Sequence, residues 1–264
     1  MPKWKLVIEY EGTRYRGWQE QVNARTVQGE VRKAAEDFIG RQVELIGSGR
    51  TDAGVHALCQ VAHLRSSMPM RSDVLCREIN DRLPADISIR DAREVSARFH
   101  ARHQAEERFY LYQLATRRTA FGKHFVWWVK DRLNVELMAQ AAGRLIGRHD
   151  FAAYCDKAED PSSTFVEVTR FELLPYGDLI LFRIGASHFL WKMVRRIVGA
   201  LVEMGRGNIS PGQMESISSA DAARWTAPPS GLFLEYVRYP GDPPPPPLTP
   251  AVISRSTDRS EPRS

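Results

Sequence analysis

The eight residues GRTDAGVH, at positions 49–56, place a single carboxylate among small residues. Asp52 follows Arg50 by two positions and precedes His56 by four, and no second acid lies close enough in sequence to share acid–base work. A lone carboxylate of this kind can act as a nucleophile and then as a base. A nearby guanidinium would favour its charged form and fix its orientation, and Arg50 is the local candidate for that role.

Three other interpretations of this segment are weaker or simpler. Asp52 could accept hydrogen bonds from its own loop in an Asx turn, with no chemistry at all. Asp52 and His56 could be metal ligands, but no third ligand is nearby, and an extended strand does not bring residues four apart together. The GSGRTDAG run resembles a phosphate loop, but it lacks the Gly-Lys-Ser/Thr ending and precedes a strand instead of a helix.

Aromatic and basic residues alternate in a second segment, 99–112, which reads FHARHQAEERFYLY. In a strand, Tyr110 and Tyr112 point to one face and Phe109 and Leu111 to the other. One pair can therefore face the core and the other a groove, where rings beside arginines such as Arg102 and Arg108 suit base stacking. The simpler alternative is a half-buried tyrosine pair in an ordinary sheet.

A third segment, WKMVRRIVG, places Lys192, Arg195 and Arg196 at helical spacing. These three cations form a basic face opposite an apolar stripe. We expect this face to be either a solvated flank or a surface that contacts phosphates, with one arginine turned toward the carboxylate. The stripe consists of Phe189, Met193, Ile197 and Met204.

The elements that must position these residues follow a repeated order. Apolar alternation and helical periodicity predict strand 3–10, helix 26–40, strands 41–47 and 55–65, helix 72–84 and strand 86–95. Thr26 and Gly40 are the expected caps of the first helix. This β-α-β-β-α-β order is the ferredoxin-like pattern.

The second half repeats that order. The expected elements are strand 108–116, helix 134–147 capped by Asn134, a hairpin of 164–174 and 178–186, helix 189–205, a short helix beginning at Ser210–Pro211 and strand 231–239. We therefore predict an α+β protein of two tandem ferredoxin-like domains, 1–104 and 105–240, that form a central RNA-binding cleft. Residues 241–264 begin with a five-proline run and are predicted to be a disordered tail.

Composition narrows the class of partner. The 264 residues contain 37 Lys and Arg against 32 Asp and Glu, a net charge of +5, which favours a polyanion such as nucleic acid. Three cysteines without a CxxC pair argue against a disulfide framework and a zinc ribbon. We expect a cytoplasmic protein, because no apolar run is long enough to span a membrane and the first residues alternate as a strand does.

Several blocks in order resemble one family. GRTDAGVHA (49–57) resembles the catalytic signature of the TruA family of tRNA pseudouridine synthases. Further matching blocks lie at 8–21, 97–112, 149–151, 187–199 and 227–240, so the resemblance covers nearly the whole chain except the tail. Two positions depart from the pattern: Lys192 stands where the family often has His, and Phe109 where it often has Arg or Lys.

The resemblance implies that the protein isomerises uridine to pseudouridine in the anticodon stem-loop of tRNA, at positions 38–40. Family members use no metal and no cofactor, and they act as homodimers that share one tRNA. Asp52 matches the nucleophile, in a loop that Gly49 and Gly54 allow to bend. Arg195 matches the arginine that orients it.

The remaining site residues are also carried over from the family. Tyr110 matches the tyrosine that stacks on the extruded base, Leu232 the apolar residue on the base's other side, and Arg50 an RNA or loop contact. His56 receives a structural role only. The rival hypotheses are a non-catalytic RNA-binding or chaperone module of the same fold and, more weakly, a metal-dependent hydrolase using Asp52 and His56.

Overall fold

Strand β1 (Lys3–Tyr10) starts the first sheet, and its alternating sequence sorts its side chains between two faces. The structure is a computed structural model and describes residues 1–156 and 164–252. Trp4, Leu6, Ile8 and Tyr10 are all buried, as the alternation predicts. These four side chains form part of the hydrophobic core in the first half of the chain.

Contacts between residues divide the chain into two units. Unit 1 comprises Met1–Phe109 and Phe233–Pro245, and unit 2 comprises Tyr110–Leu232 and the chain from Pro246 onward. The divisions fall within strands β5 (Glu107–Ala115) and β10 (Leu232–Arg238). Phe233 and Leu234 group with unit 1 because they pair in parallel with His56 and Ala57.

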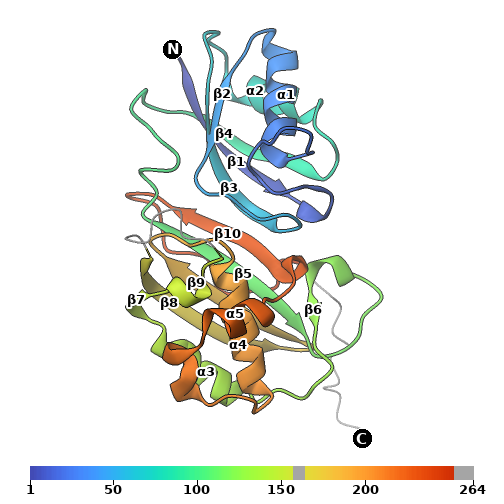
Figure 1. The fold of residues 1–264 in the computed structure, drawn as a ribbon. Helices are drawn as coiled ribbons and strands as arrows, with labels where there is room; N and C mark the ends of the chain where they lie inside the picture. Colours follow the sequence, from blue (N-terminus) through green and yellow to red (C-terminus); the bar gives the residue numbers. More distant parts are fainter. Residues whose placement is uncertain (157–163, 253–264) are drawn as a thin grey trace, which may run out of the picture. The chain divides into compact units, whose positions relative to one another are not determined.

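Unit 1 is a sheet covered by two helices on one face (Figure 1). In chain order its elements are β1, α1 (Val27–Ile39), β2 (Glu44–Gly47), β3 (His56–Arg65), α2 (Ser72–Asn80) and β4 (Ile87–Glu94). The strands lie in the order β4-β1-β3, with β2 also paired to β3, and all of these pairs are antiparallel. The loop that carries Asp52 joins β2 to β3.

The predicted caps of α1 are confirmed. The Thr26 hydroxyl accepts a hydrogen bond from the backbone N–H of Gly29, and Gly40 ends the helix in the left-handed conformation with φ of 72°. The helix thus starts and stops where its sequence signals lie, and its apolar stripe packs on the sheet.

Unit 2 contains a second mixed set of strands and helices. Its elements are β5, β6 (Trp127–Trp128), α3 (Val135–Arg144), β7 (Gly147–Asp150), β8 (Phe165–Tyr176), β9 (Leu179–Ala186), α4 (Met193–Gly205) and α5 (Ser219–Arg224). Short 3-10 helices lie at Gly12–Arg14 in unit 1 and at Lys123–Phe125, Ala152–Tyr154, Pro211–Ser216 and Pro229–Gly231 in unit 2.

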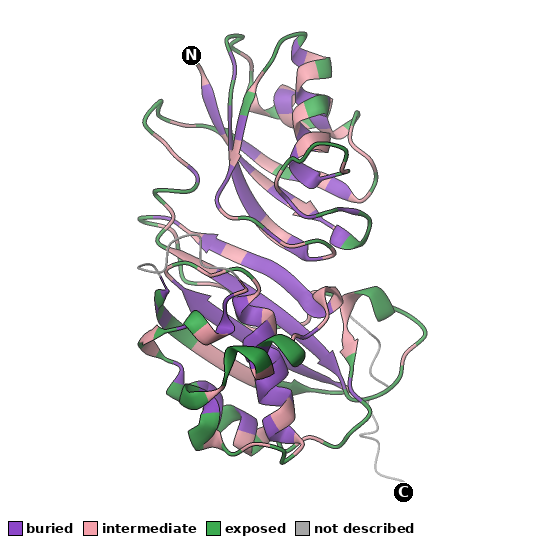
Figure 2. Cartoon of the chain, in the orientation of Figure 1, coloured by how far each residue is buried: buried purple, intermediate pink, exposed green. Residues whose placement is uncertain are grey.

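The strand order in unit 2 is β5-β9-β8-β7, and β6 pairs with β5. The predicted hairpin is confirmed, because β8 and β9 are antiparallel and close at Tyr176 and Leu179. Asn134 caps α3 as expected, and Ser210 forms a capping box with Gln213. Figure 2 shows the buried residues concentrated along the strands and on the inner sides of the helices.

The prediction that α4 begins at residue 189 was wrong. The helix begins at Met193, and Lys192 before it has a φ of 64°, in the left-handed region that side chains rarely adopt. The chain therefore turns sharply at Lys192, and Phe189 lies outside the helix.

The prediction of a basic face on this helix was wrong for Arg196. Its side chain is only 4% exposed, and its guanidinium donates to the backbone oxygen of Cys155 and to the Asp156 carboxylate. Lys192 donates to the same carboxylate and holds the pKa of Asp156 below its usual range. Asp156 therefore neutralises two of the three cations, which the spacing of the basic residues alone does not reveal.

The chain after β10 lacks helix and strand through residue 252, where Ala251 donates a backbone hydrogen bond of 2.7 Å to Gln113 Oε1. The rest of the predicted disordered tail, 253–264, lies outside the described residues. All three cysteines are free thiols. Among the helices that the structure describes, none combines the length and the apolar character needed to span a membrane.

Helix α4 packs tightly on the segment after α5, and this contact generates a stability prediction. A Cβ on Gly199 would lie 1.7 Å from the backbone oxygen of Trp225. We expect Gly199→Ala to lower the free energy of unfolding of the unit by about 2–3 kcal/mol or more, because one of the two segments must move. Urea denaturation followed by circular dichroism measures this.

Gly143→Ala is the matched control. Gly143 is also helical, and a Cβ added there would meet no atom within 4 Å. This substitution should stabilise α3 by about 0.5–1 kcal/mol through helix propensity. Equal effects of the two alanines would show that the close approach at Gly199 does not constrain the fold.

Candidate functional site

The loop that carries Asp52 is fastened to the preceding loop of unit 1 by backbone hydrogen bonds. The Trp18 N–H donates to the Thr51 oxygen at 3.1 Å, and the Gly54 N–H donates to the Tyr15 oxygen at 3.2 Å. Within the turn, the Val55 N–H donates to the oxygen of Asp52 at 3.1 Å. Asp52 is thus held on both sides, and its side chain is half-buried.

A buried side-chain hydrogen bond reinforces this attachment. The hydroxyls of Tyr10 and Thr51 lie 2.8 Å apart, and both residues are buried. Burial raises the pKa of Tyr10 well above its ordinary value, so the phenol stays protonated and remains able to donate. The residue immediately before Asp52 is therefore fixed to strand β1.

Close backbone approach explains two of the glycines in these loops. A Cβ on Gly12 would lie 1.9 Å from the oxygen of Val55, so any side chain there would push the two loops apart. Gly54 has a φ of 79°, which the turn after Asp52 requires. Gly49 has neither a positive φ nor a close neighbour, so of the two glycines expected to permit the bend, the conformation demands only Gly54.

His56 has structural contacts. Its Nδ1 accepts a 3.0 Å hydrogen bond from the N–H of Gly12, which corresponds to the neutral ring protonated at Nε2. Its ring stacks on Phe233 with centroids 4.8 Å apart. Over the residues that the structure describes, no group of three or more His, Cys, Asp or Glu side chains is placed to hold a metal ion. The geometry therefore offers no support for His56 as a partner of Asp52 in metal binding.

Arg108 clamps the start of this loop, a role that the sequence did not reveal. Its guanidinium donates to the backbone oxygens of Ser48 at 3.0 Å, Arg102 at 2.7 Å and Ala105 at 3.0 Å. Arg108 thus joins the residue before Gly49 to the 99–112 segment. That the rings beside Arg108 stack on bases stays a prediction.

In unit 2, Arg195 is held by a reciprocal pair of hydrogen bonds. Its Nε donates to the oxygen of Ala227 at 2.7 Å, and the N–H of Ala227 donates to the oxygen of Arg195 at 3.0 Å. Nearby, the Tyr112 hydroxyl donates to the oxygen of Pro228 at 2.9 Å, and burial raises the pKa of Tyr112 well above its ordinary value. Helix α4, strand β5 and the 227–232 segment are thereby joined.

Tyr110 and Leu232 are the other candidates in unit 2. Tyr110 is 8% exposed, and its ring meets that of Phe189 edge to face at 4.9 Å. Leu232 is buried and follows Gly231, where a Cβ would lie 2.7 Å from the Tyr112 ring. Phe109 and Leu111 are buried as well, so the side chains on both faces of this strand are largely covered.

The candidates therefore divide between the two units. Asp52 and the exposed Arg50 lie in the loop of unit 1, whereas Tyr110, Arg195 and Leu232 lie in unit 2. Within unit 1 the loop offers one half-exposed carboxylate on a fixed backbone. Within unit 2, hydrogen bonds hold Arg195 near the buried Tyr112. A pinned carboxylate suits nucleophilic or base chemistry more than binding alone.

Comparison with known proteins identifies relatives over most of the chain. A family model described as tRNA pseudouridine synthase matches residues 6–104 and 141–240. A tRNA pseudouridine synthase A of Nitrosomonas europaea is 41% identical over 239 residues, covering 89% of this chain and 88% of that protein. Another, from an Exiguobacterium species, is 38% identical and covers 90% of this chain and 98% of that protein.

A solved Cbf5-Nop10-Gar1 complex contains a chain that aligns with 75% of this one and 53% of its own length. The TM-score is 0.34 at 11% identity, which is too distant for structural inference.

The Tyr10–Thr51 contact generates the next prediction. Thr51→Val keeps the side-chain shape but removes the hydroxyl, and we expect a loss of about 1–3 kcal/mol in the free energy of unfolding because the buried Tyr10 phenol loses a partner. The double variant Tyr10→Phe with Thr51→Val should lose less than the two single losses combined, since neither polar group then remains.

Gln60 is a second hydrogen-bond partner of Tyr10, and its amide also accepts from the Ser48 hydroxyl and donates to the Gly49 oxygen. Tyr10→Phe removes both partners of the phenol, so only the coupling energy of the cycle reports the Tyr10–Thr51 pair. Urea titration of all four proteins measures the coupling. Strict additivity would mean that the Tyr10–Thr51 hydrogen bond does not stabilise the loop.

Proposed function

The chain belongs to the tRNA pseudouridine synthase A (TruA) family, and on that basis we propose that it isomerises uridine to pseudouridine in tRNA. The observation that carries the proposal is the fixed backbone around Asp52, in the loop that resembles the family's catalytic signature. Thr51 and Gly54 are both bonded to the preceding loop, so the carboxylate between them is presented in one place. Binding alone would not require this restraint.

The reaction is an isomerisation that rearranges one bond of the nucleotide. The N1–C1′ bond breaks, the uracil rotates, and C5 bonds to C1′ while its proton leaves and N1 gains one. No water is consumed, so a second carboxylate that activates water, as glycosidases use, would divert the reaction to hydrolysis. Asp52 acts as the nucleophile, at C1′ or at C6, or assists the departure of the base through a glycal intermediate, and it is afterwards the base that takes the C5 proton.

The roles of the candidates in unit 2 are assigned from the family resemblance. A target uridine inside a stem-loop must be extruded at a cost of a few kcal/mol. We assign Tyr110 to stack on the extruded base and Leu232 to cover its other side. We assign Arg195 to orient the Asp52 carboxylate, a role supported by the bonds that hold its guanidinium at Ala227. Arg50, which is exposed, is assigned to the RNA.

The proposed substrate is the anticodon stem-loop of tRNA at positions 38–40. We propose that the protein acts in the cytoplasm as a homodimer, and that the reaction needs no metal and no cofactor. We propose two ferredoxin-like domains, 1–104 and 105–240, as the framework. The first half has the order β-α-β-β-α-β in β1, α1, β2, β3, α2 and β4. The elements β5, α3, β8, β9, α4 and β10 repeat it in the second half, with β6, β7 and α5 as additional elements between them. The proposed boundaries differ from the contact units in placing β10 entirely with the second half.

Mapping of the product tests the substrate assignment. Purified protein is incubated with tRNA transcripts that carry uridine at position 38, 39 or 40, or at none of them. Pseudouridine is located by carbodiimide modification and reverse-transcription stops. We expect new stops only at uridines within 38–40 and none in the transcript that lacks them.

Stops at other positions would contradict the assignment to the anticodon stem-loop. Tight binding of every transcript with no pseudouridine in any of them would contradict the enzyme and favour an RNA-binding module. The binding measurement, made on the same protein preparations, separates that result from a misfolded or inactive sample.

A further inference from the structure

The positive charge of the chain is concentrated in one segment of unit 2. Residues 116–132, here called the basic segment, contain five Lys and Arg and one Asp, which makes a net charge of +4 in a chain whose total is +5. The family model does not match residues 105–140, so this segment lies outside the matched portions. It leaves β5 at Thr116 and returns to pair with β5 through Trp127 and Trp128.

Two acidic groups form ion pairs at the segment. Asp131, which lies in the segment, binds Arg206 at 2.7 Å, and Asp178 binds Arg117 of the segment at 2.7 Å. Asp131 consequently does little to neutralise its sequence neighbours Lys130 and Arg132, which are both exposed. Among the described residues neither of these two cations forms an ion pair. These two cations therefore lie on either side of Asp131 in sequence, without an ion-pair partner among the described residues.

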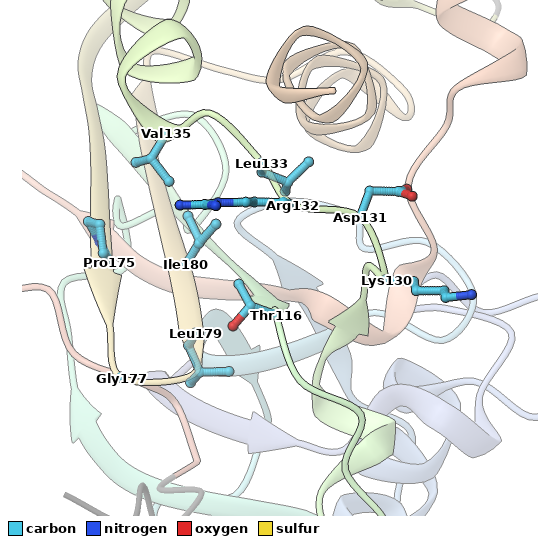
Figure 3. A pocket seen from close by; sticks show the side chains of 10 residues that line it. All are labelled: Thr116, Lys130, Asp131, Arg132, Leu133, Val135, Pro175, Gly177, Leu179 and Ile180. Atoms are coloured by element: carbon cyan, nitrogen blue, oxygen red, sulfur yellow. The ribbon is translucent and has the colours of Figure 1, made fainter. Parts of the chain in front are cut away.

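A hollow lies at the base of the basic segment, between it and the turn that joins β8 to β9. Its volume is about 360 Å³, within the lower range of ligand-sized pockets. Leu179 and Ile180 form an apolar floor, and Lys130 and Arg132 belong to its lining. Figure 3 shows the Arg132 side chain extended above Ile180 toward Val135. The Lys130 side chain points in the opposite direction, away from Ile180.

A hollow with an apolar floor and two cations in its lining suits a nucleotide within an RNA chain. A guanidinium forks onto phosphate oxygens, and an apolar floor accepts the face of a ribose or base. The same segment exposes Phe121, whose side chain is 89% accessible, and Trp128, which Arg118 overlies at 5.8 Å. Exposed rings among cations suit stacking with unpaired bases.

We propose that the basic segment and its hollow form a second RNA-contacting site, which binds the phosphate backbone of the tRNA away from the reacting uridine. This inference rests on the proposed function for the identity of the RNA. Thr116 follows Tyr110 by six positions, a span of about 20 Å along β5 and the residue after it. That distance corresponds to about six nucleotide steps at 3.4 Å each, so one tRNA can occupy both places.

The test compares two variants that remove the same charge. Lys130→Ala with Arg132→Ala removes the cations of the hollow. Arg71→Ala with Arg93→Ala removes two exposed arginines of unit 1, whose side chains are 81% and 77% accessible. Affinity for an unmodified tRNA transcript is measured by fluorescence anisotropy over a series of salt concentrations, and melting temperatures verify that both proteins are folded.

The hollow variant should raise Kd about tenfold at 0.1 M salt and flatten the slope of log K against log salt by about 1.5, since roughly two phosphate contacts are lost. The control should change Kd less than twofold. Arg132→Lys, which keeps the charge, should retain most of the affinity. Equal effects of the two double variants, or no effect of either, would overturn the proposal.

A change of oligomeric state in the hollow variant, with unchanged tRNA affinity, would also overturn the proposal and indicate a protein interface. Sedimentation velocity on the same samples detects it. The outcome is independent of the proposed reaction, because binding is measured directly. A wild-type protein that bound tRNA through this site and formed no pseudouridine would refute the enzyme and leave the second site intact.

Discussion

The attachment of the Asp52 loop to its neighbouring loop is the constraint on which the proposed catalytic role of Asp52 depends. Thr51 is held by its backbone to Trp18 and by its hydroxyl to Tyr10, while Gly54 is held to Tyr15. Only glycine at position 12 permits the loops to approach this closely. A carboxylate in a free loop would lose much of its effectiveness, because catalysis requires the reacting atoms to be held close to their final geometry.

The single carboxylate of the GRTDAGVH segment fits the chemistry of an isomerisation. Hydrolysis of a glycosidic bond needs one group to activate water and another to protonate the leaving group, whereas here the departing base must be recaptured. One carboxylate that reacts and then removes a proton is enough. The surrounding structure accordingly supplies hydrogen bonds to the backbone, as Arg108 does through Ser48, and the basic segment of unit 2 supplies charge for the RNA.

Hydrophobic periodicity in the sequence predicted most of the helices and strands. Residue types predicted the helix caps at Thr26, Gly40 and Asn134, because local signals determine these features. The single carboxylate could be singled out from residue types, but its role came from the resemblance. Arg196 was misplaced because its burial depends on Asp156, 40 positions away. Likewise the carbonyl clamp of Arg108 and the left-handed Lys192 result from tertiary contacts that leave no periodic signal.

The most direct test of the account is tritium release from tRNA labelled at C5 of uridine, with wild-type protein and Asp52→Asn side by side. C5 must lose its hydrogen when it bonds to C1′, so release reports the rearrangement itself. The account predicts release by the wild type, no detectable release by the variant, and tRNA affinity within a few-fold for both. Release by Asp52→Asn at the wild-type rate would contradict the assignment of this carboxylate as the reacting group.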